Sequence, residues 1–347
     1  MNKENAFNYT YGYDKTEQSN IHSTLRRDLT TQMYSDSAFH YTSFENCINM
    51  LKFDEGVLED SAKMVTLEMF VSHFSFMNDP SELYDGLRYV AERLKMLSIS
   101  NQVVQNVVAD FQESLNEFTF KNSLHNYILS FSTDGNNLTQ WKYYGRDCGV
   151  AIEYDLPNLE FSGWQNDENY ATHNAFQVFY QKPGSNTSLN SILCKIENLS
   201  GPNAGRDAKS YLLDAVALTS FIKNEHYCDE REVRMLFTLY YNENNASAEA
   251  KGRLLRKIDF RPRNHDLVPY IRVRLRNKEQ GCWPIKSITV GPGTNQERIY
   301  RALIMFIQTK YQSGGLSTLT KKTFSDDCKG VNVNGIDVKY SLIPFQG

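Results

Sequence analysis

Apolar and polar residues alternate most clearly in a stretch of the chain that begins at Glu230. In an extended strand, residues two apart point to the same side. The stretch therefore predicts a strand with one polar face and one face turned toward a core. The polar face is expected to carry Glu230, Glu232 and Arg234, and the core face Val233, Met235 and Phe237.

Other short runs of apolar, aromatic and β-branched residues predict further strands. A short strand begins at Phe39, and Met64 to Phe76 holds one or two more. The remaining predicted strands are Asn126 to Thr133, Gly149 to Tyr154, Ala175 to Gln181, Ile285 to Val290 and Tyr340 to Phe345.

Apolar residues at helical spacing and capping signals predict helices between these strands. Thr42 and Glu45 form a capping box that starts the first helix, and Asp79 followed by Pro80 starts another. Further helices are expected over Gln102 to Phe120, Leu138 to Tyr144, Asp207 to Asn224 and Gln296 to Tyr311.

The irregular succession of strands and helices predicts an α+β fold, with a mixed, largely antiparallel sheet core flanked by helices. We expect residues 37–347 to form a single domain, preceded by a polar extension over residues 1–36. A loop-rich insertion is expected near residues 156–206, because residues 183–206 are rich in Ser, Asn and Gly.

The composition is that of a globular protein and excludes some classes of function. Of 347 residues, 41% are hydrophobic and 22% are charged, and the net charge of −4 gives no overall field that attracts nucleic acid. The six cysteines form no C-x-x-C pair, so neither a zinc site nor a disulfide framework is indicated. With no signal peptide or membrane-spanning run, we expect a cytoplasmic protein with reduced thiols.

Two acidic residues and a histidine are the first candidates for chemistry. Glu230 and Glu232 lie close enough for their pKa values to separate, as in acid/base or cation-stabilising sites; the alternative is an ordinary solvated Glu–Arg pair. His40 ends a strand beside a helix N-terminus, where an anion such as a pyrophosphate is favoured. The alternative is a histidine packed at a strand end.

Other polar or aromatic residues are candidates of lower rank. Ser130 and Ser132 share one face of their strand, and Trp141 is either a core residue or the wall of a pocket. Asn78 and Asp79 could touch a ligand, although capping already accounts for Asp79. A basic strand face formed by Arg272, Arg274 and Arg276 fits phosphates, an acidic target or simple solvation. Neither G-x-G-x-x-G nor a P-loop occurs.

Several motifs in fixed order resemble the bacterial domain-of-unknown-function family 2971, over roughly residues 38 to 310. They are Phe39-His40-Tyr41-Thr42-Ser43, Asn78-Asp79-Pro80 with Glu82, Ser130-Phe131-Ser132 with Trp141, Gly149-Val150-Ala151-Ile152, Glu230-Arg231-Glu232-Val233-Arg234 and Gly291-Pro292. The chain departs from that family at His226-Tyr227, where a Trp is usual, and in its longer N-terminal extension. The resemblance implies no activity.

The order of a first-strand His, a Ser-x-Ser strand and a later Glu-x-Glu strand also resembles the ADP-ribosyltransferase superfamily. That resemblance implies that Glu232 hydrogen-bonds the ribose 2′-OH of NAD and stabilises an oxocarbenium-like transition state, and that Glu230 accepts a proton from the attacking group. His40 would bind the NAD ribose, and Ser130, or alternatively Ser132, would support the nicotinamide pocket. The full set of implied NAD-binding residues is His40, Tyr41, Thr42, Ser130, Ser132 and Trp141.

The function expected from this resemblance is an NAD-dependent ADP-ribosyltransferase-like enzyme, a bacterial or phage-encoded toxin or defence effector. NAD would be its substrate, a protein or nucleic acid its acceptor, and a cognate inhibitor or partner protein a further partner. Two alternatives stay open. One is a metal-dependent hydrolase or nuclease with His40, Asp79, Glu230 and Glu232 as ligands; the other is a non-catalytic module that binds a nucleotide or a protein.

Overall fold

A computed structural model describes most of the chain. The described residues are 37–51, 66–77, 81–116, 124–145, 149–162, 170–240, 258–263, 266–279, 282–310, 319–322 and 327–344. The expected extension over residues 1–36 and the expected helix start at Asp79 lie outside these ranges. No helix in the described ranges is long and apolar enough to cross a membrane.

Strands and helices alternate irregularly along the chain, as the sequence predicts. The strands are β1 (Ala38–Thr42), β2 (Thr66–His73), β3 (Leu124–Ser132), β4 (Val150–Tyr154), β5 (Leu159–Ser162), β6 (Tyr170–Gln177), β7 (Phe179–Tyr180), β8 (Ile222–Lys223), β9 (Glu232–Tyr240), β10 (Asp259–Arg263), β11 (Asp266–Asn277), β12 (Ile285–Val290), β13 (Leu319–Lys322), β14 (Cys328–Val333) and β15 (Ile336–Ser341). The α-helices are α2 (Phe44–Met50), α3 (Ser81–Met96), α4 (Gln102–Asn116), α5 (Leu138–Gln140), α6 (Thr187–Glu197), α7 (Ala204–Thr219) and α9 (Gln296–Lys310).

Short turns of helix connect several of these elements. They are the 3-10 helices η3 (Phe74–Phe76), η5 (Leu156–Asn158), η6 (Pro183–Ser185) and η7 (Glu225–Glu230), and the π-helical turn η4 (Trp141–Gly145).

One large sheet organises the fold. Its main path runs β10-β11-β2-β3-β1-β4-β12-β15-β14-β13, with β9 and β6 added beyond β3 and β5 paired to β11. Its pairs are antiparallel among the described strands, apart from the parallel pair β12–β15. The structure therefore confirms an α+β fold with a mixed, largely antiparallel sheet flanked by helices.

The sheet has two parts, which we call the first and the second half-sheet. The first runs from β1 through β4, β12, β15 and β14 to β13, and the second contains β10, β11, β2, β3, β9, β6 and β5. The link between β1 and β3 is one bridge, Phe39 to Ser132. The main hydrophobic core takes residues from both half-sheets, including Ile152 and Val290 from the first and Phe131 and Val233 from the second.

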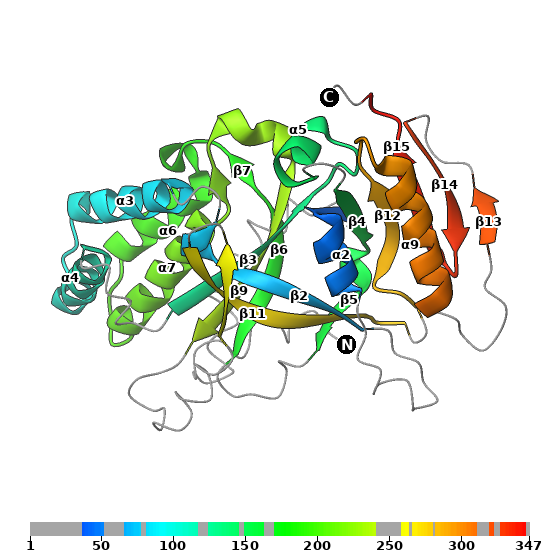
Figure 1. Cartoon of the computed structure of the whole chain (residues 1–347). Coiled ribbons are helices and arrows are strands. Elements are labelled where there is room, and N and C mark those ends of the chain that lie inside the picture. The colour runs from blue at the N-terminus through cyan, green and yellow to red at the C-terminus, as the bar shows by residue number, and fades with distance from the viewer. Residues whose placement is uncertain are drawn as a thin grey trace.

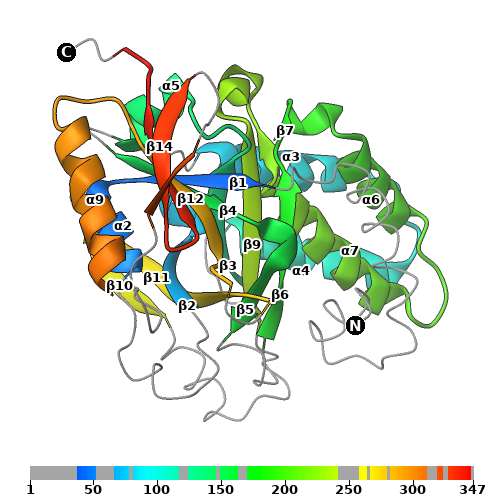
Figure 2. The ribbon, with the colours of Figure 1, turned by 90° about the vertical axis from the view of Figure 1, so that its right-hand side faces the viewer.

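Helices cover the two half-sheets on different sides of the molecule. Helices α3, α4, α6 and α7 gather at one end, on the left of Figure 1, where they share a second core. Helix α9 lies at the other end beside β12, β14 and β15 and contributes Leu303 and Ile307 to the main core. Figure 2, turned by 90°, shows the same separation.

The predicted loop over residues 183–206 is wrong, because α6 occupies Thr187–Glu197. Asn186 caps this helix by accepting a hydrogen bond from the Leu189 backbone N–H at 2.9 Å. Its buried residues, Leu189, Ile192, Leu193 and Ile196, recur at helical spacing. The loop is predicted from the Ser- and Asn-rich composition, although the apolar residues follow the spacing of an amphipathic helix. Residues 159–162 and 170–174, also within the predicted loop-rich insertion, lie in strands β5 and β6, and residues 175–177 of β6 agree with the strand predicted from Ala175.

Two other boundaries differ from the prediction. The N-cap of α2 is Ser43, whose side chain accepts from the Asn46 N–H at 3.2 Å, so the capping box at Thr42 and Glu45 is wrong by one residue. Thr42 is the last residue of β1. The last strand is β15, which ends at Ser341, several residues earlier than predicted.

Candidate functional site

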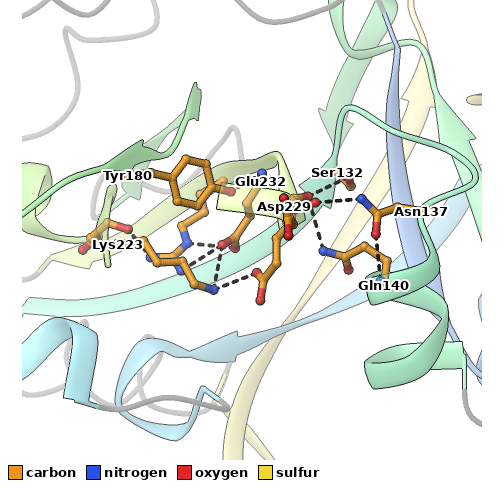
Figure 3. A network of polar contacts seen from close by, with 10 residues as sticks. Ser132, Asn137, Gln140, Tyr180, Lys223, Asp229 and Glu232 are labelled. Carbon is orange, nitrogen blue, oxygen red and sulfur yellow. Dashed lines mark hydrogen bonds and ion pairs between the residues drawn. The ribbon is translucent and has the colours of Figure 1, made fainter. Parts of the chain in front are cut away.

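Four charged side chains meet at the start of β9, and we call them the buried charge cluster. Lys223 Nζ lies 2.8 Å from Glu230 Oε2 and 3.3 Å from Glu232 Oε2. Arg234 donates from Nε to Glu232 Oε1 at 2.8 Å and from Nη2 to Glu232 Oε2 at 3.0 Å. Each of these side chains is less than one tenth exposed. The cluster therefore holds two carboxylates and two cations inside the protein (Figure 3).

Glu230 and Glu232 reach the cluster from different elements. Glu232 is the first residue of β9, whereas Glu230 ends η7, and the prediction that both lie in one strand is wrong for Glu230. Arg231 between them has a left-handed backbone with φ of 47°, which breaks the strand. From Glu232 onward the predicted alternation is confirmed, because Val233, Met235 and Phe237 are buried in the main core.

Arg234 and Tyr180 connect the cluster to its surroundings. Arg234 Nη1 donates to the Ser220 carbonyl at the end of α7 at 2.8 Å, so the cluster ties α7 to the sheet. The Tyr180 hydroxyl accepts from the Glu232 backbone N–H at 2.5 Å. Burial raises the pKa of Tyr180. This tyrosine therefore stays neutral beside Glu232.

The neighbouring cations keep Glu232 ionised. Burial alone would raise the pKa of Glu232, but the charges of Arg234 and Lys223, together with hydrogen bonding from Arg234, lower it to about 2. The Ser130 hydroxyl oxygen is itself buried and has no hydrogen-bond partner at normal geometry among the described residues. The site thus offers a permanent carboxylate charge, beside a hydroxyl that has capacity for a further hydrogen bond.

The end of β3 and the segment that follows it donate hydrogen bonds to backbone carbonyls of η7. Ser132 Oγ donates to the Glu230 carbonyl at 2.8 Å, and Gln140 Nε2 donates to the same carbonyl at 3.3 Å. Asn137 Nδ2 donates to the Asp229 carbonyl at 2.7 Å. Figure 3 shows these three side chains on the opposite side of η7 from Lys223. Glu230 is therefore fixed from two directions.

His40 and Glu232 do not come together on one face of the sheet. Phe39 pairs with Ser132, which pairs with Glu232, and residues paired across antiparallel strands point to the same side. His40 follows Phe39, so it points to the opposite side, where it makes an edge contact with Phe131, 6.1 Å between ring centroids. The NAD site implied by the resemblance needs His40 and Glu232 on the same face of the sheet. The pairing of β1 with β3 instead aligns Phe39 with Glu232, so His40 is one residue away from the required position.

His40 instead contacts Ser130 through the backbone. Its Nδ1 donates to the Ser130 carbonyl at 3.0 Å. Burial lowers the pKa of His40, and the charge of Arg261 lowers it further, although the carbonyl bond acts in the other direction. The imidazole is therefore neutral near pH 7, with its proton on the nitrogen that faces Ser130.

Tyr41, Thr42 and Trp141 have structural partners. The Tyr41 hydroxyl donates to the Asp134 carbonyl at 2.6 Å and accepts from the Asn137 N–H at 2.9 Å. Thr42 is buried in β1 opposite Val150. Trp141 is buried against Tyr41, 4.6 Å between ring centroids. Of the two alternatives for Trp141, this packing favours the core residue.

Sequence reasoning missed Lys223, Tyr180, Asn137 and Gln140. Lys223 was expected at the end of a long helix, but α7 ends at Thr219 and Lys223 lies in the short strand β8. A lysine directly after Phe221 and Ile222 was the available signal, because a cation in an apolar run needs a buried partner. The other three act on backbone groups, and sequence patterns do not show such contacts.

The described residues contain no group of three or more His, Cys, Asp or Glu side chains that could hold a metal ion. Glu230 and Glu232, two of the four ligands in the hydrolase alternative, are bonded to Lys223 and Arg234. Asp79, a third, lies outside the described ranges.

Comparison with known proteins gives one match. Residues 140–235 match the model of a family described as "Protein of unknown function (DUF2971)". The match bears out the family resemblance for this segment, which contains Trp141 and the whole buried charge cluster, while His40 and Ser130 lie before it. No curated protein matches the chain, and no solved structure matches it.

Proposed function

We propose that this protein is an ADP-ribosyltransferase-like enzyme that cleaves the nicotinamide–ribose bond of NAD, with Glu232 as its essential carboxylate. The supporting observation is that Glu232 is held ionised, with a pKa of about 2, at the first residue of β9 beside Ser130. Cleavage of the bond builds positive charge on the ribose. A fixed negative charge next to that ribose lowers the barrier without a proton transfer.

The two carboxylates have different roles in this proposal because Lys223 binds them unequally. Lys223 is closer to Glu230, at 2.8 Å, than to Glu232, at 3.3 Å. We expect the positively charged nicotinamide ribosyl group to replace Lys223 at Glu232 while Lys223 keeps its bond to Glu230. Glu232 then hydrogen-bonds the ribose, and Glu230 accepts the proton of the attacking group.

Ser130 and His40 support this site from the neighbouring strand. The Ser130 hydroxyl, which has no hydrogen-bond partner in the described part of the chain, is available to a substrate bound at Glu232. His40 acts as a positioning residue, because it holds the Ser130 carbonyl from the other side of the sheet. This role differs from the direct ribose contact that the sequence resemblance implies.

In the same proposal the ADP-ribose passes to a protein or nucleic acid acceptor, as in a toxin or a defence effector. The acceptor need not be known to test the first step, because hydrolysis of NAD releases nicotinamide in its absence.

The test is nicotinamide release from NAD by the purified protein and by two glutamate variants. Glu232→Gln should lower the rate by about 100-fold or more, the scale for losing a preorganised transition-state contact. Glu153→Gln is the matched control, since Glu153 is a largely buried glutamate of the first half-sheet that contacts Lys339 at 3.4 Å. It should leave the rate unchanged.

Calorimetric titration of NAD and thermal melting accompany the rate measurement. A Glu232→Gln variant that melts cooperatively but releases nicotinamide at the normal rate contradicts the proposal. So does an unaltered protein that binds no NAD at millimolar concentration.

A further inference from the structure

Arginine and aromatic side chains form a continuous row on one face of the second half-sheet. In the pairing of β11 with β2, Tyr270 lies opposite Ser72, Arg272 opposite Phe70 and Arg274 opposite Glu68. These pairs alternate at two-residue spacing, so they point to one side of the sheet. We call the row the arginine face; its members are Arg261, Arg272, Arg274 and Arg276 with Phe70 and Tyr270. Figure 1 shows β2 and β11 side by side across the front of the molecule.

The arginines and rings of this face contact one another in sequence. The Arg261 guanidinium lies 5.6 Å from the centroid of the Tyr270 ring, which lies 4.7 Å from the Phe70 ring. The Arg272 guanidinium lies 5.6 Å from the Phe70 ring. Such cation–π contacts hold long side chains against the sheet. The face therefore presents ordered guanidinium groups and not freely moving ones.

The face is exposed, although it includes large groups. Phe70 is 40% exposed, and the side chains of Arg272 and Arg274 are 53% and 52% exposed. An aromatic ring that is this accessible, between exposed arginines, is available to a planar partner. Tyr270, which is buried, packs beside the Phe70 ring on the same side of the sheet.

The local charge is positive even though the chain as a whole is negative. Asp259 pairs with Arg272 at 2.7 Å, and Glu68 lies 3.6 Å from Arg272 and 3.8 Å from Arg274. Glu160 of β5 is paired with Arg276 across the strands, so the four arginines share this face with three acidic positions, Asp259, Glu68 and Glu160. The carboxylates orient the guanidinium groups but do not cancel their charge.

We infer that the arginine face binds single-stranded nucleic acid, with the arginines on the phosphates and Phe70 stacked on a base. A positive surface with an accessible ring is the arrangement that sequence-tolerant single-strand binding uses. Arginines at every second residue of β11 follow an extended backbone, and a duplex would keep its bases away from Phe70. An acidic peptide would use the charges and leave the ring without a partner. This inference does not depend on the proposed NAD chemistry.

Fluorescence anisotropy of labelled oligonucleotides tests the inference. The full chain is titrated into a single strand of mixed sequence, into the corresponding duplex and into labelled polyglutamate, at several salt concentrations. We expect the single strand to bind tightest. The double change Arg272→Ala/Arg274→Ala should reduce the slope of log affinity against log salt by about 1.4, because each of the two lost phosphate contacts contributes about 0.7 for single strands.

Two further variants separate stacking from charge and from damage to the fold. Phe70→Leu keeps apolar contact area but removes the ring, and it should weaken single-strand binding by at least about fivefold. Arg301→Ala removes an exposed arginine of α9 and should change nothing. Thermal melting confirms that each variant is folded.

Three outcomes overturn the inference. One is the absence of single-strand binding at low salt. Another is binding that the double arginine change leaves unaltered. The third is that polyglutamate binds as tightly as the oligonucleotide and that Phe70→Leu changes neither affinity. That result would assign the face to acidic peptides instead.

Discussion

The segments 230–234 and 272–276 both place charged residues at every second position, but their surroundings are opposite. The first supplies three members of the buried charge cluster, each less than one tenth exposed. The second supplies Arg272 and Arg274, whose side chains are about half exposed. Both strands are internal to the sheet, since β9 pairs with β3 and β6, and β11 pairs with β10 and β2.

The difference comes from what packs on each strand. Lys223 and the Ser220 carbonyl, both just after α7, reach the charged face of β9, so every charge there has a partner inside the protein. On β11 the charges are paired beside water, where such pairs contribute little to stability. Alternation along a strand therefore reports which residues share a face, and cannot report whether another element covers that face.

The largest expected effect in this comparison is the loss of a cation from the buried charge cluster. Arg234→Met should lower the free energy of unfolding by about 3–5 kcal/mol, because it leaves the Glu232 carboxylate buried without its main partner. Urea denaturation at pH 7 measures the change. The double variant Glu232→Gln/Arg234→Met should recover part of the loss, and a loss below about 1 kcal/mol for the single variant would contradict a buried ion pair.

Asp214 provides a third case, a buried carboxyl that forms no ion pair with a described cation. It lies in α7, is 6% exposed, and its Oδ2 has no hydrogen-bond partner among the described residues. Burial raises its pKa from 3.8 to about 7, and Lys195 only partly opposes this. The native state therefore holds its proton more tightly than the unfolded state, so stability falls as pH rises between these two values.

The expected size of this effect follows from the pKa shift. Between about pH 5.5 and pH 8, the unaltered protein should lose about 2 kcal/mol of unfolding free energy through Asp214. Asp214→Asn should remove this component and be the more stable protein at the higher pH. Urea denaturation of both proteins at the two pH values measures it; equal pH dependence in the two proteins would show that Asp214 ionises freely in the fold.

The smallest expected effect is at the arginine face. Arg272→Ala should change the free energy of unfolding by at most about 1 kcal/mol, and less in high salt, because its pairs with Asp259 and Glu68 are exposed. The same urea titration, repeated with added sodium chloride, measures the change. A decrease in the free energy of unfolding as large as that of Arg234→Met would mean that the exposure of the side chains does not determine how much the two charged segments stabilise the fold.

The sequence predicts most of the strands because their apolar periodicity survives in the fold. The core face of β9, the strand at β12 and the helix at α9 all agree with it. The prediction misses α6 because it relies on composition there. The polar residues between the buried positions are typical of a loop, although the buried residues recur at helical spacing. It also starts the predicted strand too early, at Glu230, because no glycine marks the left-handed backbone of Arg231 that separates Glu230 from β9.

The candidate site is less predictable than the fold. Glu230, Glu232 and Arg234 can be identified as a group from their spacing, but Lys223 joins them only through the packing of β8 beside η7. The phase of His40 against Glu232 depends on the register of β1 with β3, which one bridge sets. Long-range register of this kind has no local sequence signal.

The strand order also determines when the sheet can be completed during synthesis. β4 pairs with β12, and β2 pairs with β11, although each partner is made long after the strand that it joins. A growing chain that has reached the end of β9 therefore still carries two strand edges that wait for their neighbours. Such edges are sites of mistaken pairing, so the emergence of β11 and β12 from the ribosome is the step at which chaperones would matter most for this protein.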